Sequence, residues 1–241
     1  MIEVKYLLIG VGDSLMGHTN LDTFIPEGTS SYMAQLNHKL GDDVYTIQCG
    51  YGGQTMTGSK TWIHQWAMNI HAFNQFPVAY VNKHQVKITP NTKIATVWQF
   101  GTNDARVWED AKTLFKRMYE LQLTKFNDGK HFVALIPSLW DSNACNQSKV
   151  NDEILQIDVT KIDHTNLNNK IYFSDKYHPN QLGVDMMVNN ALPLLRSYFK
   201  GGVTPTPTPI PIPTNDIAKL LDENDRMLID IKNNNNAIRK L

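Results

Sequence analysis

The chain of 241 residues has a hydrophobic fraction of 41% and a charged fraction of 19%, which is typical of a globular protein and excludes a disordered one. Its 23 basic and 23 acidic residues balance, so composition predicts neither nucleic acid nor an anionic membrane as a partner. No apolar run approaches the roughly 20 residues of a membrane span. Cys49 and Cys145 lie outside any Cys/His cluster, so we expect neither a disulfide framework nor a metal site.

Short apolar segments alternate with segments of helical periodicity. The apolar segments are Tyr6–Ile9, Val44–Ile47, Ile94–Phe100, His131–Ile136 and a weaker fifth, Ile171–Phe173. Helical spacing marks Tyr32–Leu40, Ala111–Phe126 and a last helix that begins at Pro179. Because apolar strands separated by helices form parallel sheets covered on both faces, this order predicts an α/β fold.

The first strand leads into Gly12-Asp13-Ser14-Leu15, which places a serine at the tight turn after the strand. Ligand sites in open α/β sheets lie at the carboxyl ends of the strands, so Ser14 would be presented at that edge. Taken alone the tetrapeptide is a weak signal, since Gly, Asp and Ser also form ordinary turns.

The second strand is followed by the glycine-rich segment Gly50–Thr55, and the third by Gly101-Thr102-Asn103-Asp104. The glycines form either a plain flexible turn or a close approach of a backbone N–H to a substrate oxygen. Asn103 and Asp104 are equally open to two interpretations. They suit an ordinary turn, but the Asn103 amide can also donate a hydrogen bond without adding charge.

Asp175 and His178 stand three residues apart after the weak fifth strand, and Pro179 suits the first position of the last helix. Across a turn, the Asp175 carboxylate can reach one imidazole nitrogen and leave the other for a serine. An isolated Asp-x-x-His is more often a surface turn. The other seven histidines have no comparable neighbours, and we interpret them as structural or exposed.

These four motifs each follow a different predicted strand, so a parallel sheet would gather them at one edge. A nucleophile, a base, an orienting acid and two neutral hydrogen-bond donors are the groups that acyl transfer requires. Each motif is weak by itself. Their common placement indicates a site for acyl transfer.

The four motifs resemble, in order and spacing, the motif blocks of the SGNH (GDSL) hydrolases over roughly residues 1–200. This resemblance implies a three-layer α/β/α flavodoxin-like fold with a parallel sheet, and ester hydrolysis without a metal or other cofactor. One departure is Gln48, where the second block usually carries an asparagine.

The same resemblance implies a role for each matching residue. Ser14 would be the nucleophile, His178 the general base and then acid, and Asp175 the residue that orients the histidine. The oxyanion hole would consist of the backbone N–H groups of Ser14 and Gly53 with the side chain of Asn103.

Five of the 11 prolines occupy every second position of Pro205–Pro213. Alternating prolines favour a stiff polyproline II spacer, and the two preceding glycines indicate the end of a domain. We therefore divide the chain into a hydrolase domain over 1–200, a Pro/Thr-rich linker over 201–215 and a helix over 216–241.

The terminal helix repeats apolar or Asn residues with a strict 4-3 spacing, at Ile217, Leu221, Asn224, Leu228, Ile231, Asn235 and Ile238. This spacing is typical of a coiled-coil seam, in which polar residues fix register and oligomer number. A helix folded back on the body is the alternative, but the stiff spacer favours a coiled coil. We expect a homotrimer, similar to the oligomerising segments of phage tail or cell-surface proteins.

The substrate follows less directly from the sequence. Aromatic residues in segments that could border the sheet edge suit sugar rings, although core packing explains each as well: Trp62, Trp66, Tyr80, Trp108 and Trp140. Multivalent display favours a repetitive polymer, so we expect an acetylated glycan and a carbohydrate O-acetylesterase. The alternatives are a lipase or acyl-thioesterase, and a glycan- or receptor-binding module that retains the fold.

The first residues lack the basic region, apolar stretch and cleavage site of a secretory signal. We expect cytoplasmic synthesis, which fits a cytoplasmic enzyme, a virion component such as a phage tail protein, or a piece of a longer chain.

Overall fold

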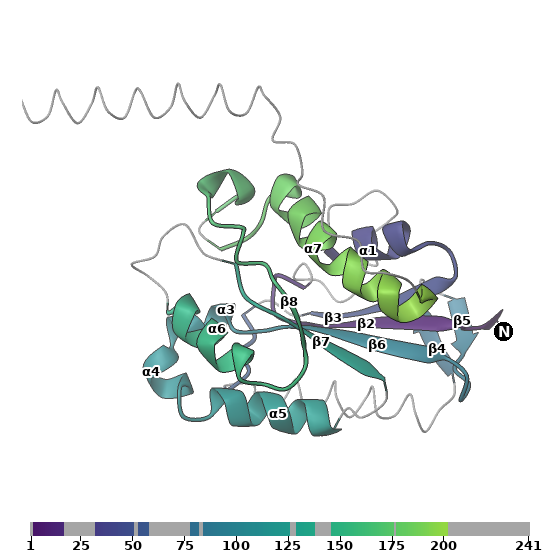
Figure 1. Ribbon diagram of the computed structural model, residues 1–241, viewed down its shortest axis with the longest axis horizontal. Coiled ribbons are helices and arrows are strands. Elements are labelled where there is room, and N and C mark those ends of the chain that lie inside the picture. The colour runs from purple at the N-terminus through teal and green to yellow at the C-terminus, as the bar shows by residue number, and fades with distance from the viewer. Residues whose placement is uncertain are drawn as a thin grey trace, which may run out of the picture. The chain divides into compact units, whose positions relative to one another are not determined.

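The computed structural model in Figure 1 describes residues 2–16, 32–50, 53–57, 78–81, 84–125, 129–137, 146–175 and 177–201. The linker and the coiled coil that we expect beyond these residues lie outside the described part. None of the described helices is long and apolar enough to cross a membrane.

Within the described residues, the centre of the fold is a parallel sheet of five strands, which confirms the predicted α/β architecture. In order across the sheet, the strands are β3 (Val44–Gly50), β2 (Tyr6–Gly12), β6 (Lys93–Gln99), β7 (Lys130–Ala134) and β8 (Thr160–Ile162). The register aligns Gly12 of β2 with Gly50 on one side and with Gln99 on the other. The carboxyl ends of β2, β3 and β6 therefore meet at one edge of the sheet.

Helices cover both faces of this sheet: α1 (Tyr32–Leu40) and α7 (Gln181–Lys200) on one face, and α4 (Trp108–Ala111), α5 (Phe115–Lys125) and α6 (Gln147–Leu155) on the other (Figure 1). Alternate residues of β2 divide between the two cores. Leu8 packs among residues of α1 and α7, whereas Leu7 and Ile9 pack among residues of α4, α5 and α6. Burying an aliphatic side chain of this size contributes about 1.5–3 kcal/mol of stability, so both layers hold the sheet in place.

A second, smaller sheet adjoins the N-terminus and was not predicted. Strand β5 (His84–Lys87) pairs parallel with β1 (Ile2–Glu3) and antiparallel with β4 (Val78–Val81). The Thr92 hydroxyl donates a hydrogen bond to the Val4 carbonyl at 2.7 Å, which ties the chain after β5 to the start of β2.

The predicted fifth strand at Ile171–Phe173 is wrong. Lys170–Tyr172 forms a 3₁₀ turn, and Phe173 makes only an isolated bridge with Pro179. The apolar run arises because Tyr172 and Phe173 fill the core that also contains residues of α7. Neither residue belongs to a strand of the sheet. The fifth strand of the sheet is β8, which has three residues and only one that is fully buried, too few to give a period-two pattern.

Two predicted helix boundaries also need correction. Pro179 is not the first residue of α7, because the Asn180 side chain accepts a hydrogen bond from the Gly183 N–H at 3.1 Å and caps the helix. The helix predicted at Ala111–Phe126 is interrupted, since Ala111 ends α4 and α5 begins at Phe115. Helix α6 was not predicted.

Of the five aromatic residues in segments that could border the sheet edge, two lie among the described residues. Trp108 is buried and packs against Phe115, with the ring centroids 6.0 Å apart, so it belongs to the core. Tyr80 lies within β4. The remaining three, Trp62, Trp66 and Trp140, lie outside the part of the chain that the structure describes.

Candidate active site

Ser14 lies in the tight turn that follows β2, at the carboxyl edge of the sheet, as predicted. The Asp13 N–H donates to the Gln99 carbonyl at 3.0 Å, and the Leu15 N–H donates to the Asp13 carboxylate at 2.9 Å. A Cβ on Gly12 would lie 2.4 Å from the Gln99 carbonyl oxygen, so only glycine lets the end of β2 approach β6 this closely. The turn is thus fixed on both sides of Ser14, whose side chain remains partly exposed.

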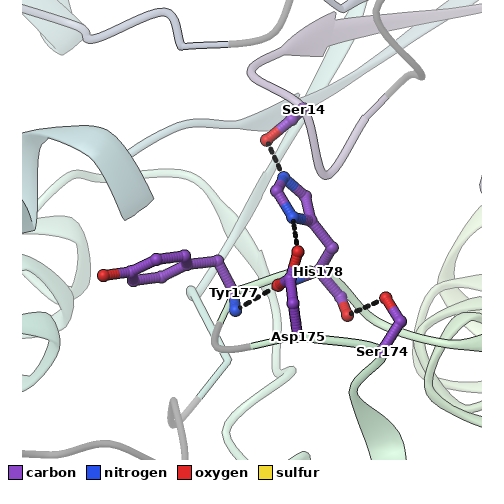
Figure 2. Close-up of polar contacts among 5 residues, drawn as sticks. All are labelled: Ser14, Ser174, Asp175, Tyr177 and His178. Carbon is purple, nitrogen blue, oxygen red and sulfur yellow. Dashed lines mark hydrogen bonds and ion pairs between the residues drawn. The ribbon is translucent and has the colours of Figure 1, made fainter.

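His178 and Asp175 meet Ser14 at this edge, as Figure 2 shows. His178 Nε2 lies 3.1 Å from Ser14 Oγ, and His178 Nδ1 lies 2.7 Å from Asp175 Oδ2. Both distances are within hydrogen-bonding range. The side chains of His178 and Asp175 are 45% and 54% exposed, so this row of three groups is open to solvent. Such a row can pass the serine proton to an imidazole that the carboxylate orients.

The loop that carries His178 is fastened by several hydrogen bonds. The Ser174 hydroxyl donates to the His178 carbonyl at 3.0 Å (Figure 2). The Ser174 N–H donates to the same carbonyl at 2.9 Å. The N–H groups of Tyr177 and His178 both donate to Asp175 Oδ1, each at 2.7 Å. On the other side of the histidine, the Asn180 N–H donates to the Tyr172 carbonyl at 2.9 Å. The imidazole is therefore held at an otherwise exposed site.

These contacts also set the charge of Asp175. Partial burial acts to raise the pKa of the Asp175 carboxyl, but hydrogen bonds from the His178 ring and from the Tyr177 and His178 N–H groups outweigh it and hold that pKa below its usual value. Asp175 is consequently ionised at neutral pH and can stabilise a protonated imidazole.

Gly53 and Asn103 belong to segments that the structure brings together. Gly53 has a φ of +78°, a conformation that favours glycine. Asn103 is the second residue of helix α3 (Thr102–Arg106), and its Nδ2 donates to the Gln54 carbonyl at 2.9 Å. An amide nitrogen carries two N–H bonds, so one remains for another acceptor. Within the described residues, neither the Ser14 nor the Gly53 backbone N–H donates a hydrogen bond.

One side of the site is joined to the other by Arg106 and Tyr177. The Arg106 guanidinium carbon lies 5.1 Å from the centroid of the Tyr177 ring, which is a cation–π contact. Arg106 follows Asn103 by three residues on α3, and Tyr177 precedes His178. The pair therefore connects the helix that bears Asn103 to the histidine loop. Nothing in the sequence indicated this contact, because the two residues lie far apart along the chain.

Other titratable groups have structural surroundings. His164 is fully buried, lies 3.3 Å from the Asn190 amide, and has its pKa lowered to about 3 by burial. His131 Nδ1 lies 2.6 Å from the Thr96 hydroxyl. In the described ranges, no three His, Cys, Asp or Glu side chains are grouped so that they could hold a metal ion.

Asp13 is a fully buried carboxyl next to Ser14, and its burial was not predicted. Burial raises the pKa of Asp13 to about 7, the hydrogen bond from the Leu15 N–H opposes this, and the charge of Asp104 adds to it. A folded-state pKa above the unfolded value means that the stability Asp13 contributes is fully present below about pH 4 and is lost as the pH rises towards 7.

We therefore expect Asp13→Asn to be stabilised relative to the parent chain as the pH rises. Asparagine can keep the hydrogen bond from Leu15 but cannot ionise. The difference in the free energy of unfolding between variant and parent should shift in favour of the variant by about 2–3 kcal/mol between pH 5 and pH 8. Urea unfolding at both pH values measures this shift. Asp152→Asn, on the exposed face of α6, serves as the control. The prediction would be contradicted if the free energy of unfolding changed with pH equally in Asp13→Asn and in the parent.

Comparisons with known proteins bear on the fold. No protein-family model and no curated protein sequence matches the chain. Among solved structures, a lipolytic protein of the G-D-S-L family from Veillonella parvula is 19% identical, with a TM-score of 0.53, over 78% of this chain and 96% of its own. Est24, a carbohydrate acetylesterase from Sinorhizobium meliloti, is 12% identical, with a TM-score of 0.60, over 80% of this chain and 99% of its own.

A third neighbour, the aryl esterase of M. smegmatis, is 13% identical, with a TM-score of 0.58, over 80% of this chain and 99% of its own. These neighbours are similar over nearly their whole length. The chain therefore has the fold of the G-D-S-L lipolytic proteins, and the predicted SGNH hydrolase fold is confirmed.

Proposed function

We propose that the chain is a serine ester hydrolase that acts through an acyl-enzyme. The observation that carries this proposal is the row of contacts at the sheet edge, in which His178 Nε2 lies 3.1 Å from Ser14 Oγ and His178 Nδ1 lies 2.7 Å from Asp175 Oδ2. In this proposal Ser14 is the nucleophile, His178 the general base and then acid, and Asp175 the group that orients the imidazole. The names of the structural neighbours, one a lipolytic protein and two of them esterases, support the same reaction class.

The reaction proceeds in two halves. His178 Nε2 takes the proton of Ser14 Oγ while that oxygen attacks the ester carbonyl carbon, and the resulting oxyanion accepts hydrogen bonds from the Ser14 and Gly53 N–H groups and from the Asn103 amide. The bond to the alcohol oxygen then breaks, and His178 returns its proton to that oxygen. Water, deprotonated by His178, attacks the acyl-serine, and the carboxylic acid leaves as Ser14 is restored.

We favour an O-acetylated carbohydrate as the substrate. One neighbour is named a carbohydrate acetylesterase and another a carbohydrate esterase of family 3. The half-exposed side chains of His178 and Asp175 also leave room for a bulky alcohol such as a polysaccharide. A lipase or acyl-thioesterase with the same catalytic residues is the alternative.

A panel of esters separates these substrates. Rates are measured for p-nitrophenyl acetate, butyrate and octanoate, and acetate release is measured from an acetylated polysaccharide, with the Ser14→Ala variant as the blank. We expect the acetyl ester to exceed the octanoyl ester at least about tenfold in kcat/KM, and acetate to be released from the polymer. A preference for octanoate would favour the lipase-type alternative. A folded parent chain no faster than Ser14→Ala on every ester would contradict the hydrolase itself.

A binding module that retains the fold is a second candidate. Its task would be attachment to a glycan or receptor, for which an activated serine has no use. Incubation with a fluorophosphonate distinguishes the two, because covalent labelling of Ser14 needs a base within reach of its hydroxyl. Labelling of the parent chain but not of Ser14→Ala supports the enzyme, and an unlabelled parent supports the binding module.

We further propose that residues 216–241 join three chains and present the site in several copies, as in a phage tail or cell-surface device. The 4-3 spacing of apolar and Asn residues in this segment supports the idea. Light scattering should give the mass of three chains for the full protein and of one chain for residues 1–200. A full protein that is monomeric would contradict it, and a trimeric 1–200 fragment would place the contact elsewhere.

A further inference from the structure

Asp104 is a buried carboxyl at the third position of α3, next to Asn103, and its side chain faces the segment 53–57. Its Oδ2 accepts a hydrogen bond from the Met56 N–H at 2.8 Å. Its Oδ1 accepts two more from Thr57, one from the N–H at 3.1 Å and one from the hydroxyl at 2.8 Å. A single side chain thus binds three donors that all come from one short segment.

The same segment is held a second time by the neighbouring residue. Asn103 Nδ2 donates to the Gln54 carbonyl at 2.9 Å, so adjacent residues of α3 contact both ends of the segment 53–57. Gly53, the proposed oxyanion donor, begins this segment and has a left-handed φ of +78°. The conformation of this segment does not by itself fix the distance between the Gly53 N–H and the Asn103 amide. Hydrogen bonds from α3 to the segment are needed to fix it.

We propose that Asp104 is a positioning residue that fixes the Gly53 N–H relative to the Asn103 amide, so that both donors reach the same oxyanion. This inference rests on the proposed ester hydrolysis. A carboxylate suits the role because both its oxygens accept, and the donors here are two N–H groups and one hydroxyl. Asparagine has the same shape but turns an amide N–H₂ towards one of these donors. The segment would then shift while most of the surrounding core stays in place.

The alternative is that Asp104 only stabilises the fold. Burial raises the pKa of Asp104, and the hydrogen bonds from Met56 and Thr57 oppose that rise, as expected of either role. The two roles differ in what a substitution changes. A positioning role lowers kcat, because oxyanion donors act in the transition state, and leaves KM nearly unchanged. A purely structural role lowers the melting temperature and leaves kcat of the folded protein intact.

The test uses the full chain with Asp104→Asn, Thr57→Val and Thr57→Ser, and p-nitrophenyl acetate as the probe. We expect Asp104→Asn to lower kcat by about 30- to 300-fold, near the loss of one oxyanion donor, with KM changed less than threefold. Thr57→Val removes one of the three hydrogen bonds and should lower kcat less, by about 2- to 10-fold. Thr57→Ser keeps the hydroxyl, so its kcat should lie closer to that of the parent than the kcat of Thr57→Val does. The pH at which kcat/KM is half-maximal should stay at the parent value in all three variants, since His178 is not touched.

Asp152→Asn, on exposed α6, is the control for the loss of one carboxylate. Asp104→Asn with kcat within threefold of the parent would overturn the inference, whatever its melting temperature. If Asp104→Asn does not fold, equal kcat values for Thr57→Val and Thr57→Ser would overturn it. A parent chain no faster than Ser14→Ala would instead overturn the proposed function, so the two failures are distinguishable.

Discussion

Replacing Ser14 by alanine is expected to lower kcat/KM for p-nitrophenyl acetate by at least about a thousandfold. The hydroxyl that lies 3.1 Å from His178 Nε2 is the atom that forms the acyl bond in the proposed mechanism, and alanine has no atom to replace it. His178 and Asp175 stay in place in this variant, so any residual rate comes from water activated by the imidazole or from binding alone. Initial rates at neutral pH, with the active sites titrated in the parent, measure the loss.

The control for this change is Ser148→Ala, a serine on the exposed surface of α6. The Ser148→Ala variant should hydrolyse the ester at the rate of the parent chain. Ser148 lies on α6, and α6 and α7 cover opposite faces of the sheet. Circular dichroism and the melting temperature of Ser14→Ala should equal those of the parent, because the Ser14 side chain is only partly buried. A folded Ser14→Ala variant that hydrolyses the ester at a rate near that of the parent would contradict the assignment of the nucleophile.

The sequence was most informative where a motif follows a buried strand. The segments at Tyr6–Ile9 and Ile94–Phe100 are continuous apolar runs because both faces of β2 and β6 are covered, and this made them recognisable as parallel strands. Parallel strands end at a common edge, so the positions of Ser14 and Asn103 followed from topology alone. The structure aligns the ends of β2 and β6 in register, as this reasoning requires.

The prediction was weaker where short or irregular segments carry the site. The structure places Asp175 beside His178, but the strand expected before them is a 3₁₀ turn, and the helix after them begins one residue beyond the cap at Asn180. The loop takes its shape from hydrogen bonds of Ser174 and Asn180 to nearby carbonyls. Two of these bonds are donated by backbone N–H groups and one by the Ser174 hydroxyl, and none of them leaves a periodic pattern in the sequence.

Contacts between residues far apart in the sequence could not be predicted either, because they also leave no local pattern. Asp104 and Thr57 are separated by 47 positions, and their hydrogen bonds form only because β3 and β6 end on either side of β2. From the sequence, Asp104 was open to interpretation as a turn residue. In the folded chain Asp104 is buried and accepts three hydrogen bonds from the segment 53–57. Its burial depends on the packing of this segment against α3.

Asp175→Asn is expected to lower kcat/KM by roughly a thousandfold or more at neutral pH, although it keeps the shape of the side chain. Oδ1 of Asp175 accepts the N–H groups of Tyr177 and His178, so the asparagine carbonyl must take that position. The amide N–H₂ then occupies the place of Oδ2, 2.7 Å from His178 Nδ1. Facing a donor, Nδ1 must become an acceptor, and the imidazole proton moves to Nε2. An Nε2 that already carries a proton cannot take one from Ser14.

This explanation makes the tautomer of His178 the decisive measurement, because kinetics alone do not separate a wrong tautomer from a displaced loop. In the parent chain, ¹⁵N spectra of the imidazole at high pH should show the proton on Nδ1, and in Asp175→Asn they should show it on Nε2. Asp163→Asn is the matched control, since Asp163 accepts similar hydrogen bonds from Thr165 in an exposed turn and should leave activity and tautomer unchanged. If Asp175→Asn retains activity within tenfold of the parent, the carboxylate neither selects the tautomer nor stabilises the imidazolium, and the proton relay would reduce to Ser14 and His178.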